Sequence, residues 1–274
     1  MLGTGTPYPD PARSGPATAI VVDDMPYLVD FGPGVVRRVM AAYQGGVNAF
    51  GRAGINIKTA FLTHLHSDHT MGYPDLIFTP WIMGRAEALT VYGPPGLKAM
   101  TEDVLRAWQI DISGRAPRSL HPDAWRPVAH EITPGTIYRN ARMMVTAFPV
   151  HHHEMKDSFG FRFDTPDRSV VISGDTTPAP ELIENARGCD VLVHEAYSMA
   201  SYKRVTPDWQ DFRRTHHTSS EELAAIAAET KPRLLVLYHC SNAGDLRGDM
   251  AELLREVRSL YSGDVIAGRD LDVL

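Results

Sequence analysis

The sequence contains little cysteine and no long apolar run. Only two of its 274 residues are cysteines, Cys189 and Cys240, and they do not form a Cys-x-x-Cys pair. Two thiols are too few for a disulfide framework, so cysteine usage does not decide the redox compartment. No stretch approaches the roughly 18 apolar residues that a membrane-spanning helix needs, so we expect a soluble protein without a membrane partner.

An excess of basic charge is also missing. The chain has 27 Lys and Arg against 33 Asp and Glu, a formal net charge of −6. Loose binding to a phosphate backbone draws its affinity from clustered Lys and Arg, so this balance argues against nucleic acid as a partner unless a local site binds it. Repeats with a period of about 20 to 50 residues are absent as well. We therefore expect a single domain over residues 1–274.

Histidine, in contrast, is abundant and clustered. The sequence has 12 histidines. They gather at residues 64–69, at 151–153 and at 216–217. Because histidine is the commonest metal ligand in proteins, this clustering suggests a metal site before any motif is considered.

Short apolar runs alternate with amphipathic stretches along the chain, which indicates an α/β fold. The runs predict strands over residues 19–22, 27–30, 59–64, 89–93, 143–150, 169–175, 191–195 and 234–239. The amphipathic stretches predict helices over residues 35–43, 95–109, 179–186, 219–229 and 250–260. Prolines interrupt residues 110–140, which we expect to lie outside the sheet.

Side chains that can bind metals stand where several of these strands end. His64, Asp175, His194 and His239 each close an apolar run, so we expect them to gather at one edge of a sheet. Residues 197–216 lie between two of these segments and carry four aromatic residues among charged ones. We interpret this passage as a lid insertion, with an aromatic-pinned surface loop as the alternative.

The strongest signal is the segment His64-Leu65-His66-Ser67-Asp68-His69. At the end of a strand, His64 and His66 can point to the same side, and Asp68 and His69 then enter a turn towards Gly72. One short loop would thus present three imidazoles and a carboxylate. Nitrogen and oxygen ligands without a thiolate suit zinc and other borderline divalent ions rather than calcium or an iron–sulfur cluster.

One loop cannot complete a coordination sphere, so further ligands must come from other strand ends. The candidates are one of His151 to His153, then Asp175, then His239. The whole set resembles the metallo-β-lactamase superfamily, whose motif is His-x-His-x-Asp-His followed by a distant His, Asp and His. The resemblance covers nearly the whole chain and implies a four-layer αββα sandwich.

Within that superfamily the chain is most similar to the ribonuclease Z-like branch, which includes zinc arylsulfatases and phosphodiesterases. The similarity rests on Leu2-Gly3-Thr4-Gly5-Thr6-Pro7, Val29-Asp30-Phe31-Gly32, His194-Glu195-Ala196 and His217-Thr218-Ser219. The last segment has the order that we associate with arylsulfatase-like members, whereas the ribonucleases have His-Ser-Thr. The resemblance therefore favours a small ester substrate over tRNA.

The same resemblance implies two metal ions. It assigns His64, His66 and the histidine of the third motif to one ion, Asp68, His69 and His239 to the other, and Asp175 to both. Matching the family pattern Val-x-His to Val150-His151-His152 selects His152, with His151 as the alternative. His153 is then a solvated residue or one at the substrate rim.

Two divalent ions held about 3.5–4 Å apart can share a bridging hydroxide, formed from a water whose pKa falls to about 7, and can polarise an ester oxygen. Such a centre makes a hydrolase, and its residual positive charge favours an anionic ester. We count three residues as catalytic: Asp68 as a ligand, His217 as the proton donor to the leaving group, and Glu195 as the carboxylate that orients His217. Asp30 is interpreted as a brace for the metal loop.

The main hypothesis is a binuclear hydrolase of an aryl sulfate or a phosphodiester that also accepts other ester classes. One alternative is a ribonuclease Z-type tRNA 3′-processing endonuclease, and another is a hydrolase of a lactone, β-lactam or carboxylic ester. A tRNA-processing enzyme should carry a protruding basic or glycine-rich arm, and the sequence contains no such insert. This absence also favours the small-ester hypothesis.

Zinc is the expected metal, although Mn²⁺ and Fe²⁺ accept the same ligand types. A homodimer is an expectation from the resemblance alone. We expect a cytoplasmic location. Met1 directly precedes the Leu-Gly-Thr-Gly turn, where the family usually has a few strand residues first, so a removed leader is the alternative.

Overall fold

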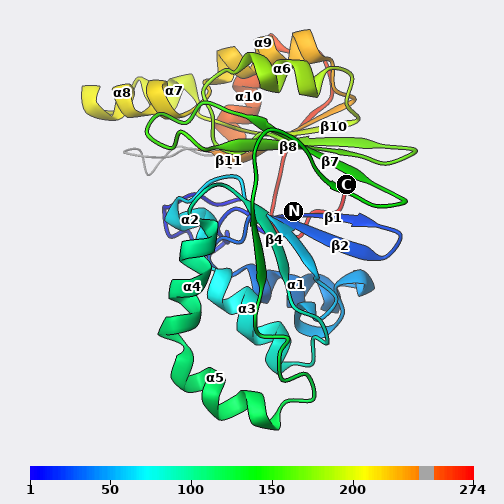
Figure 1. Cartoon of the computed structure of the whole chain (residues 1–274). Coiled ribbons are helices and arrows are strands. Elements are labelled where there is room, and N and C mark those ends of the chain that lie inside the picture. The colour runs from blue at the N-terminus through cyan, green and yellow to red at the C-terminus, as the bar shows by residue number, and fades with distance from the viewer. Residues whose placement is uncertain (241–249) are drawn as a thin grey trace. The chain divides into compact units, whose positions relative to one another are not determined.

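The computed structural model describes residues 1–240 and 250–274, which form two compact units (Figure 1). Unit 1 consists of Met1–Gly3, Asp10–Ile132 and Asp270–Leu274, and unit 2 consists of Thr4–Pro9 and Thr133–Arg269. Each unit has a sheet, helices and an apolar core of its own. The prediction of a single domain stays a prediction.

Unit 1 is built on a mixed sheet with the order β1-β2-β3-β4-β5. The strands are β1 (Thr18–Val22), β2 (Met25–Val29), β3 (Thr59–Phe61), β4 (Thr90–Gly93) and β5 (Val128–Glu131). The first two form an antiparallel hairpin, and the other neighbours pair in parallel. The carboxyl ends of β2, β3 and β4 therefore lie at the same edge of this sheet.

Helices and short 3₁₀ turns connect these strands. They are α1 (Val35–Gln44), η1 (Asn48–Phe50), η2 (Arg52–Gly54), α2 (Ser67–Thr70), α3 (Tyr73–Ile82), α4 (Leu97–Ala107), α5 (Gln109–Arg115) and η3 (Ala116–Arg118). The core of unit 1 joins apolar residues of the sheet to those of α1 and α3, among them Leu28, Val39 and Leu76. This packing gives the segments at the strand ends a rigid support.

Unit 2 contains a sheet with the order β12-β11-β10-β9-β8-β7-β6. The strands are β6 (Gly135–Arg139), β7 (Met144–Pro149), β8 (Phe159–Asp164), β9 (Ser169–Ile172), β10 (Val191–Ala196), β11 (Leu234–Cys240) and β12 (Val265–Ala267). From β6 to β9 the neighbours pair antiparallel, and from β9 to β12 they pair in parallel. The parallel half again brings several carboxyl ends to one edge.

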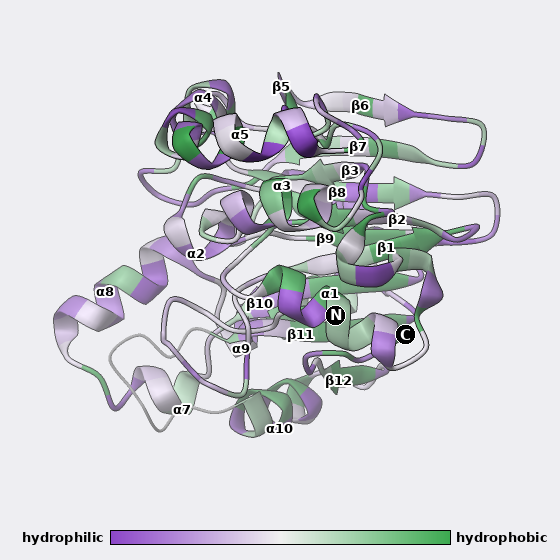
Figure 2. Ribbon diagram, turned by 90° about the horizontal axis from the view of Figure 1, so that it is seen from below, coloured by the Kyte–Doolittle hydropathy of each residue, from purple (hydrophilic) through white to green (hydrophobic). Residues whose placement is uncertain are grey.

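The helices of unit 2 are α6 (Pro180–Ala186), α7 (Met199–Tyr202), α8 (Pro207–His216), α9 (Ser220–Thr230) and α10 (Met250–Leu260). The helices α6, α9 and α10 pack together over the sheet, and their inward residues Leu182, Leu223 and Leu253 are fully buried in its core. In Figure 2 most strands are coloured as hydrophobic, whereas α8 is mainly hydrophilic. The apolar surface of α6, α9 and α10 thus stabilises the part of the sheet that carries the site.

The start of α9 follows the sequence signal closely. Ser219 is the N-cap, its side chain accepts a hydrogen bond from the backbone N–H of Glu222, and the Glu222 carboxylate accepts from the N–H of Ser219. This capping box satisfies backbone donors that a helix N-terminus otherwise leaves open. It also fixes the position of the preceding residues 217 and 218.

The structure confirms the α/β class, and helices lie at or near all of the predicted positions. The expectation for residues 110–140 is wrong in part, because β5 pairs with β4 and β6 pairs with β7. Both strands are largely exposed, so neither shows the apolar run on which the prediction relied. The sequence reading also missed α3, β8 and β12.

Residues 197–216 form two helices, α7 and α8, rather than a loop. Tyr197 is buried and stacks on Tyr202, while Trp209 is exposed and meets Phe212 edge to face. The role of this passage as a lid stays a prediction. In the described part of the chain, no helix has the length and apolar character required to cross a membrane.

Candidate metal centre

The metal loop of unit 1 follows β3 and leads into α2. His64 lies three residues beyond the end of β3, His66 is the N-cap of α2, and Asp68 and His69 belong to that helix. His64, Asp68 and His69 are buried and His66 is partly exposed. The sequence prediction that these four side chains share one short loop is therefore met within unit 1.

A glycine fixes how closely this loop approaches the neighbouring strand. Gly72 donates its N–H to the carbonyl of Phe31 at 2.8 Å, and Phe31 donates its own N–H to the carbonyl of His69 at 3.0 Å. A Cβ at Gly72 would lie 2.6 Å from the oxygen of Phe31, closer than real Cβ contacts. Only glycine allows α2 to dock against the end of β2 in this way.

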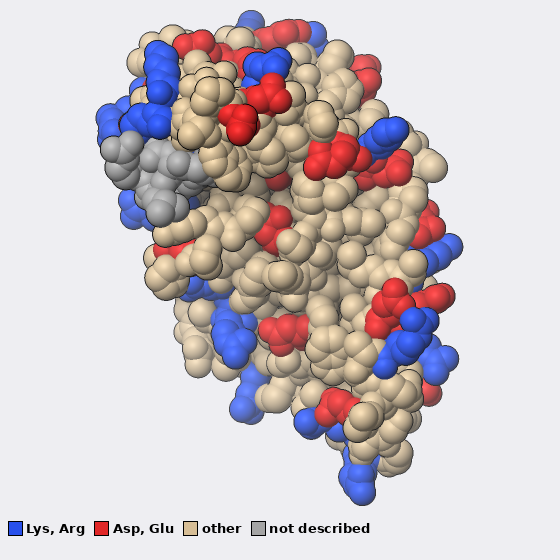
Figure 3. Space-filling view, turned by 90° about the vertical axis from the view of Figure 1, so that its left-hand side faces the viewer, with Lys and Arg blue, Asp and Glu red and all other residues tan. Residues whose placement is uncertain are grey.

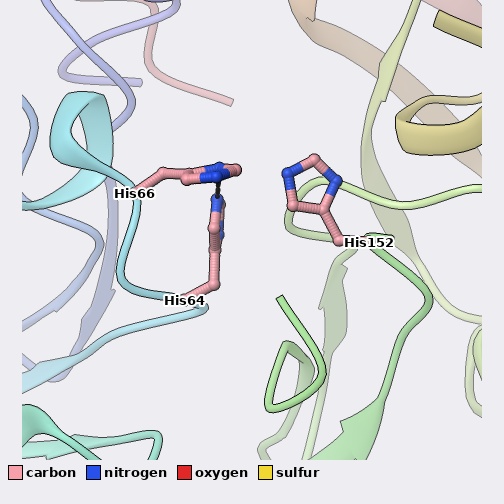
Figure 4. A group of neighbouring side chains, drawn as sticks. All are labelled: His64, His66 and His152. Atoms are coloured by element: carbon pink, nitrogen blue, oxygen red, sulfur yellow. Dashed lines mark hydrogen bonds between the residues drawn. The ribbon is translucent and has the colours of Figure 1, made fainter. Parts of the chain in front are cut away.

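The three imidazoles of the loop face one another. His64 Nε2 lies 3.0 Å from His66 Nδ1, the hydrogen bond drawn in Figure 4, and the rings of His64 and His69 have their centroids 4.1 Å apart. The Nε2 atom of His69 lies 3.6 Å from Oδ2 of Asp68. Nitrogen and carboxylate oxygen donors so close together form a donor set that suits zinc.

Asp30 braces this loop from β2, as the sequence analysis expected. Its Oδ2 lies 2.9 Å from His69 Nδ1, and its Oδ1 accepts hydrogen bonds from the backbone N–H and the hydroxyl of Thr63. Asp30 has a φ of 59°, a left-handed conformation that aspartate tolerates better than most residues. A carboxylate behind a histidine fixes its tautomer and ring orientation, which is the usual support of a metal-binding imidazole.

In unit 2, Asp175 and His239 come from the ends of the two strands that flank β10. Asp175 follows β9 by three residues and His239 is the penultimate residue of β11, with β10 between these strands. Both side chains are buried, and Nε2 of His239 lies 3.5 Å from Oδ2 of Asp175. His239 has a φ of 45°, a strained conformation that marks functional positions more often than structural ones.

The structure distinguishes His152 from its neighbour His151. The side chain of His151 is 55% exposed, whereas His152 is buried. His152 Nδ1 donates to the backbone carbonyl of His216 at 2.8 Å, which fixes the ring orientation and leaves Nε2 as the nitrogen that can bind a metal. Donor atoms of His152, Asp175 and His217 all lie within 4.8 Å of one another. These contacts support the choice of His152 as the ligand of the third motif.

His217 and Glu195 form the pair that the sequence analysis expected. Nδ1 of His217 lies 3.2 Å from Oε1 of Glu195, which also accepts the backbone N–H groups of Thr176 and Thr218. Glu195 is fully buried in β10. Burial raises the pKa of Glu195 well above its usual range, and the nearby charge of Asp175 raises it further.

His194 lies beside this pair but serves a structural purpose. It is fully buried, and its Nδ1 donates to the backbone carbonyl of Glu195 at 2.6 Å. Burial lowers the pKa of His194 to about 4, so its imidazole is neutral at pH 7. The histidine near the end of β10 is therefore not a sign of a further metal ligand.

Each unit thus presents His and Asp donors at the carboxyl end of parallel strands, which defines a metal-binding hydrolase of the metallo-β-lactamase type. A family model described as "Beta-lactamase superfamily domain" matches residues 27–240, and the chain belongs to this superfamily. The Ribonuclease Z of Mycobacterium marinum is 34% identical over 243 residues, which cover 87% of this chain and 84% of that protein.

Two solved structures show the same fold. The metallo-β-lactamase fold protein YhfI from Bacillus subtilis has a TM-score of 0.72 at 19% identity, covering 98% of this chain and 95% of that chain. Human tRNase Z, short form, has a TM-score of 0.70 at 22% identity, covering 100% of this chain and 96% of that chain. These likenesses confirm the fold class.

The expectation of an arylsulfatase-like hydrolase of small esters is wrong, because the curated relatives that match most of the chain are named Ribonuclease Z. The structure explains why the order Thr218-Ser219 misled. Thr218 donates its hydroxyl to the carbonyl of Thr176 at 2.7 Å, and Ser219 caps α9. Both hydroxyls support the backbone, and Ser and Thr are both good helix caps, so their order does not report the substrate.

Some residues of the site were missed by sequence reasoning. Thr63 and Thr176 link the strands to Asp30 and Glu195, and His216 holds His152 through its carbonyl. Their partners lie 19 to 64 positions away along the chain. Among these three residues, only Thr63 could have been suggested by the sequence, because it directly precedes the candidate ligand His64.

Proposed function

We propose that this chain is a ribonuclease Z-type endonuclease that cleaves a phosphodiester bond of precursor tRNA with the help of divalent metal ions. The observation that supports this most is the 34% identity to a protein named Ribonuclease Z along 87% of the chain. The contacts of His217 and Glu195 are consistent with the same chemistry. This proposal replaces the expectation that nucleic acid is not a partner.

The ligand set implied by the sequence resemblance is part of the proposal. It consists of the seven residues His64, His66, Asp68, His69, His152, Asp175 and His239. Zinc is the proposed metal, with Mn²⁺ or Fe²⁺ as alternatives, because the donors are nitrogen and oxygen only. When bound, such ions supply an activated water at neutral pH and offset the negative charge of the phosphate.

The protein's own proton chemistry is assigned to His217. Glu195 Oε1 accepts from Nδ1 of His217, which holds the ring in one tautomer and one orientation. A proton delivered from the other ring nitrogen to the leaving oxygen would neutralise the charge that develops when the phosphodiester bond breaks. Glu195 acts through His217 and is therefore a positioning residue.

The surface charge suggests how tRNA would be bound. On the face drawn in Figure 3, acidic and basic side chains are interspersed among the described residues, without a large field of one sign. Nonspecific binding of a phosphate backbone releases counterions in proportion to the number of neutralised phosphates. If tRNA binds this face, we expect few phosphate contacts and a shallow dependence of its affinity on salt.

The experiment is a comparison of kcat/KM on a precursor tRNA, an aryl phosphodiester and an aryl sulfate, with zinc-reconstituted protein. We expect the precursor tRNA to be the best substrate and to be cut at one position near its 3′ end. Asp175→Ala should abolish cleavage, whereas His130→Ala, which removes an exposed histidine in unit 1, should not. A higher kcat/KM on either small ester would contradict the proposal.

A homodimer and a cytoplasmic location belong to the same proposal. The homodimer derives from the resemblance to the ribonuclease Z-like branch, and the cytoplasmic location is carried over from the expectation made on the sequence. Sedimentation of the purified protein at micromolar concentration would test the dimer.

A further inference from the structure

A second cluster of metal-competent groups lies in unit 2, formed by residues that the proposed reaction does not use. His153 and Glu154 belong to the turn after β7, and His216 is the last residue of α8. His153 Nδ1 and His216 Nε2 lie 2.7 Å and 2.8 Å from the same atom, Oε2 of Glu154. Two imidazole nitrogens thus converge on one carboxylate oxygen.

The contacts of His216 hold its ring in place beside Glu154. Its Nδ1 lies 2.8 Å from the carbonyl of Phe212 and 2.9 Å from the hydroxyl of Thr215. Its Nε2 faces Oε2 of Glu154, so an imidazole nitrogen and a carboxylate oxygen, both common metal ligands, point at each other.

The three side chains differ in exposure and packing, and this difference suits an ion site. His216 is only 6% exposed and stacks on Phe212, with the ring centroids 4.2 Å apart. The side chains of His153 and Glu154 are 56% and 58% exposed, so they can move and the site is open to solvent. One fixed ligand and two adjustable ones allow entry of an ion and adjustment around it.

We propose that His153, Glu154 and His216 bind one divalent transition-metal ion, zinc above all, in addition to the ions held by the proposed catalytic ligands. Two imidazoles and one carboxylate are a known zinc donor set, with ligand distances of about 2.0–2.2 Å and a fourth position open. Tetrahedral ligands at that radius lie roughly 3.4 Å apart. The contacts of Glu154, now 2.7 Å and 2.8 Å, must therefore open by roughly 0.6–0.7 Å, which its exposed side chain permits.

Binding of this ion has a consequence for the neighbouring residues. His153 follows His152 directly, His216 precedes His217, and the carbonyl of His216 already accepts the hydrogen bond of His152. An ion at His153, Glu154 and His216 would restrain both segments. An effect of this ion on activity would depend on the proposed function. The binding of the ion does not depend on it.

The test measures metal content rather than activity. Full-length protein is equilibrated with micromolar Zn²⁺, freed of unbound metal by gel filtration and analysed for zinc per chain. We expect Glu154→Gln and His153→Asn to bind one ion less per chain than the unaltered protein. Asparagine is chosen because His153 has a φ of 40°, and asparagine adopts this left-handed conformation readily.

His130→Ala is the matched control, because it removes an exposed histidine from unit 1 and should leave the zinc content unchanged. Equal zinc contents in all four proteins would overturn the inference and would mean that a proton, not a metal, joins His216 to Glu154. Loss of zinc in the control as well would also overturn it. Failure of the tRNA cleavage assay leaves these zinc counts unaffected, so the two proposals can fail separately.

Discussion

Oδ2 of Asp30 lies 2.9 Å from Nδ1 of His69, and the two residues are 39 positions apart in the sequence. Asp30 stands at the end of β2 and His69 in α2, after β3. The parallel pairing of β2 with β3 brings these segments together. The Asp30 carboxylate thereby orients the imidazole of His69 from the end of a neighbouring strand.

Asp30→Asn should weaken metal binding without unfolding the protein. The asparagine amide keeps the size of the carboxylate, but it removes the charge behind His69. Losses of such supporting groups typically reduce metal affinity by about 10- to 100-fold. Competition with a chromogenic zinc chelator measures the change, and an affinity within about twofold of the unaltered protein would contradict the assigned role.

His217→Ala should lower kcat on precursor tRNA by about 100- to 10,000-fold, the range for loss of a general acid. Glu195→Gln should lower kcat as well, because the ring orientation is no longer fixed. If Glu195 acts through His217, the double variant should be no slower than His217→Ala alone. Additive losses would indicate a separate role for Glu195, and the zinc content of each variant serves as the control.

His194 should make the metal-free protein less stable in acid. Burial lowers the pKa of His194 to about 4, from 6.5 for an unperturbed histidine. Below pH 6.5 the unfolded chain binds a proton that the folded protein rejects, so the free energy of unfolding falls until about pH 4. The full loss is about 3 kcal/mol, at 1.36 kcal/mol per pKa unit.

Urea denaturation of the metal-free protein at pH 7 and pH 4.5 tests this effect. The variant His194→Gln cannot titrate, so its stability should fall less over the same interval than that of the unaltered protein. The difference between the two proteins in this loss of unfolding free energy should approach about 3 kcal/mol. Parallel pH profiles for the two proteins would show that His194 does not contribute.

Arg85 should contribute strongly to the stability of unit 1. Its guanidinium is fully buried and donates to the carbonyls of Leu76, Ile77 and Ala124 at 2.9–3.2 Å. Burial lowers the pKa of Arg85 to about 10. Arg85→Met removes the donors and leaves the carbonyls buried, which costs on the order of 3 kcal/mol.

The urea midpoint of Arg85→Met should therefore fall, with an unchanged slope. Arg85→Lys is the matched control, because it keeps the charge but cannot reach three carbonyls with a planar group. We expect it to recover only part of the loss. Full stability in either variant would contradict the structural role.

Local patterns predicted much of the fold. The capping box at Ser219 and Glu222, the helix over 250–260 and the strand runs of β7 and β11 lie where the sequence placed them. The metal loop was also visible, because its four donors lie within residues 64–69. Propensity, periodicity and short motifs act over a few residues, so a sequence alone can carry them.

Exposed edge strands and long-range contacts escaped prediction. The edge strand β5 exposes most of its residues, so it lacks the apolar signature of a buried strand. The contact of Glu154 with His216 joins residues 62 positions apart, and nothing in either neighbourhood indicates the other. The role of Thr218 was missed for the same reason, because its hydroxyl donates to the carbonyl of Thr176, 42 positions away.

The order of residues along the chain thus decided the superfamily, the α/β class and the donor types, since each depends on local composition and spacing. The tertiary structure alone decided which histidine of 151–153 is buried, that Thr63 and Thr176 donate to Asp30 and Glu195, and that Glu154 meets His216. These choices depend on strand order and burial, which arise only when segments far apart in the sequence pack against one another.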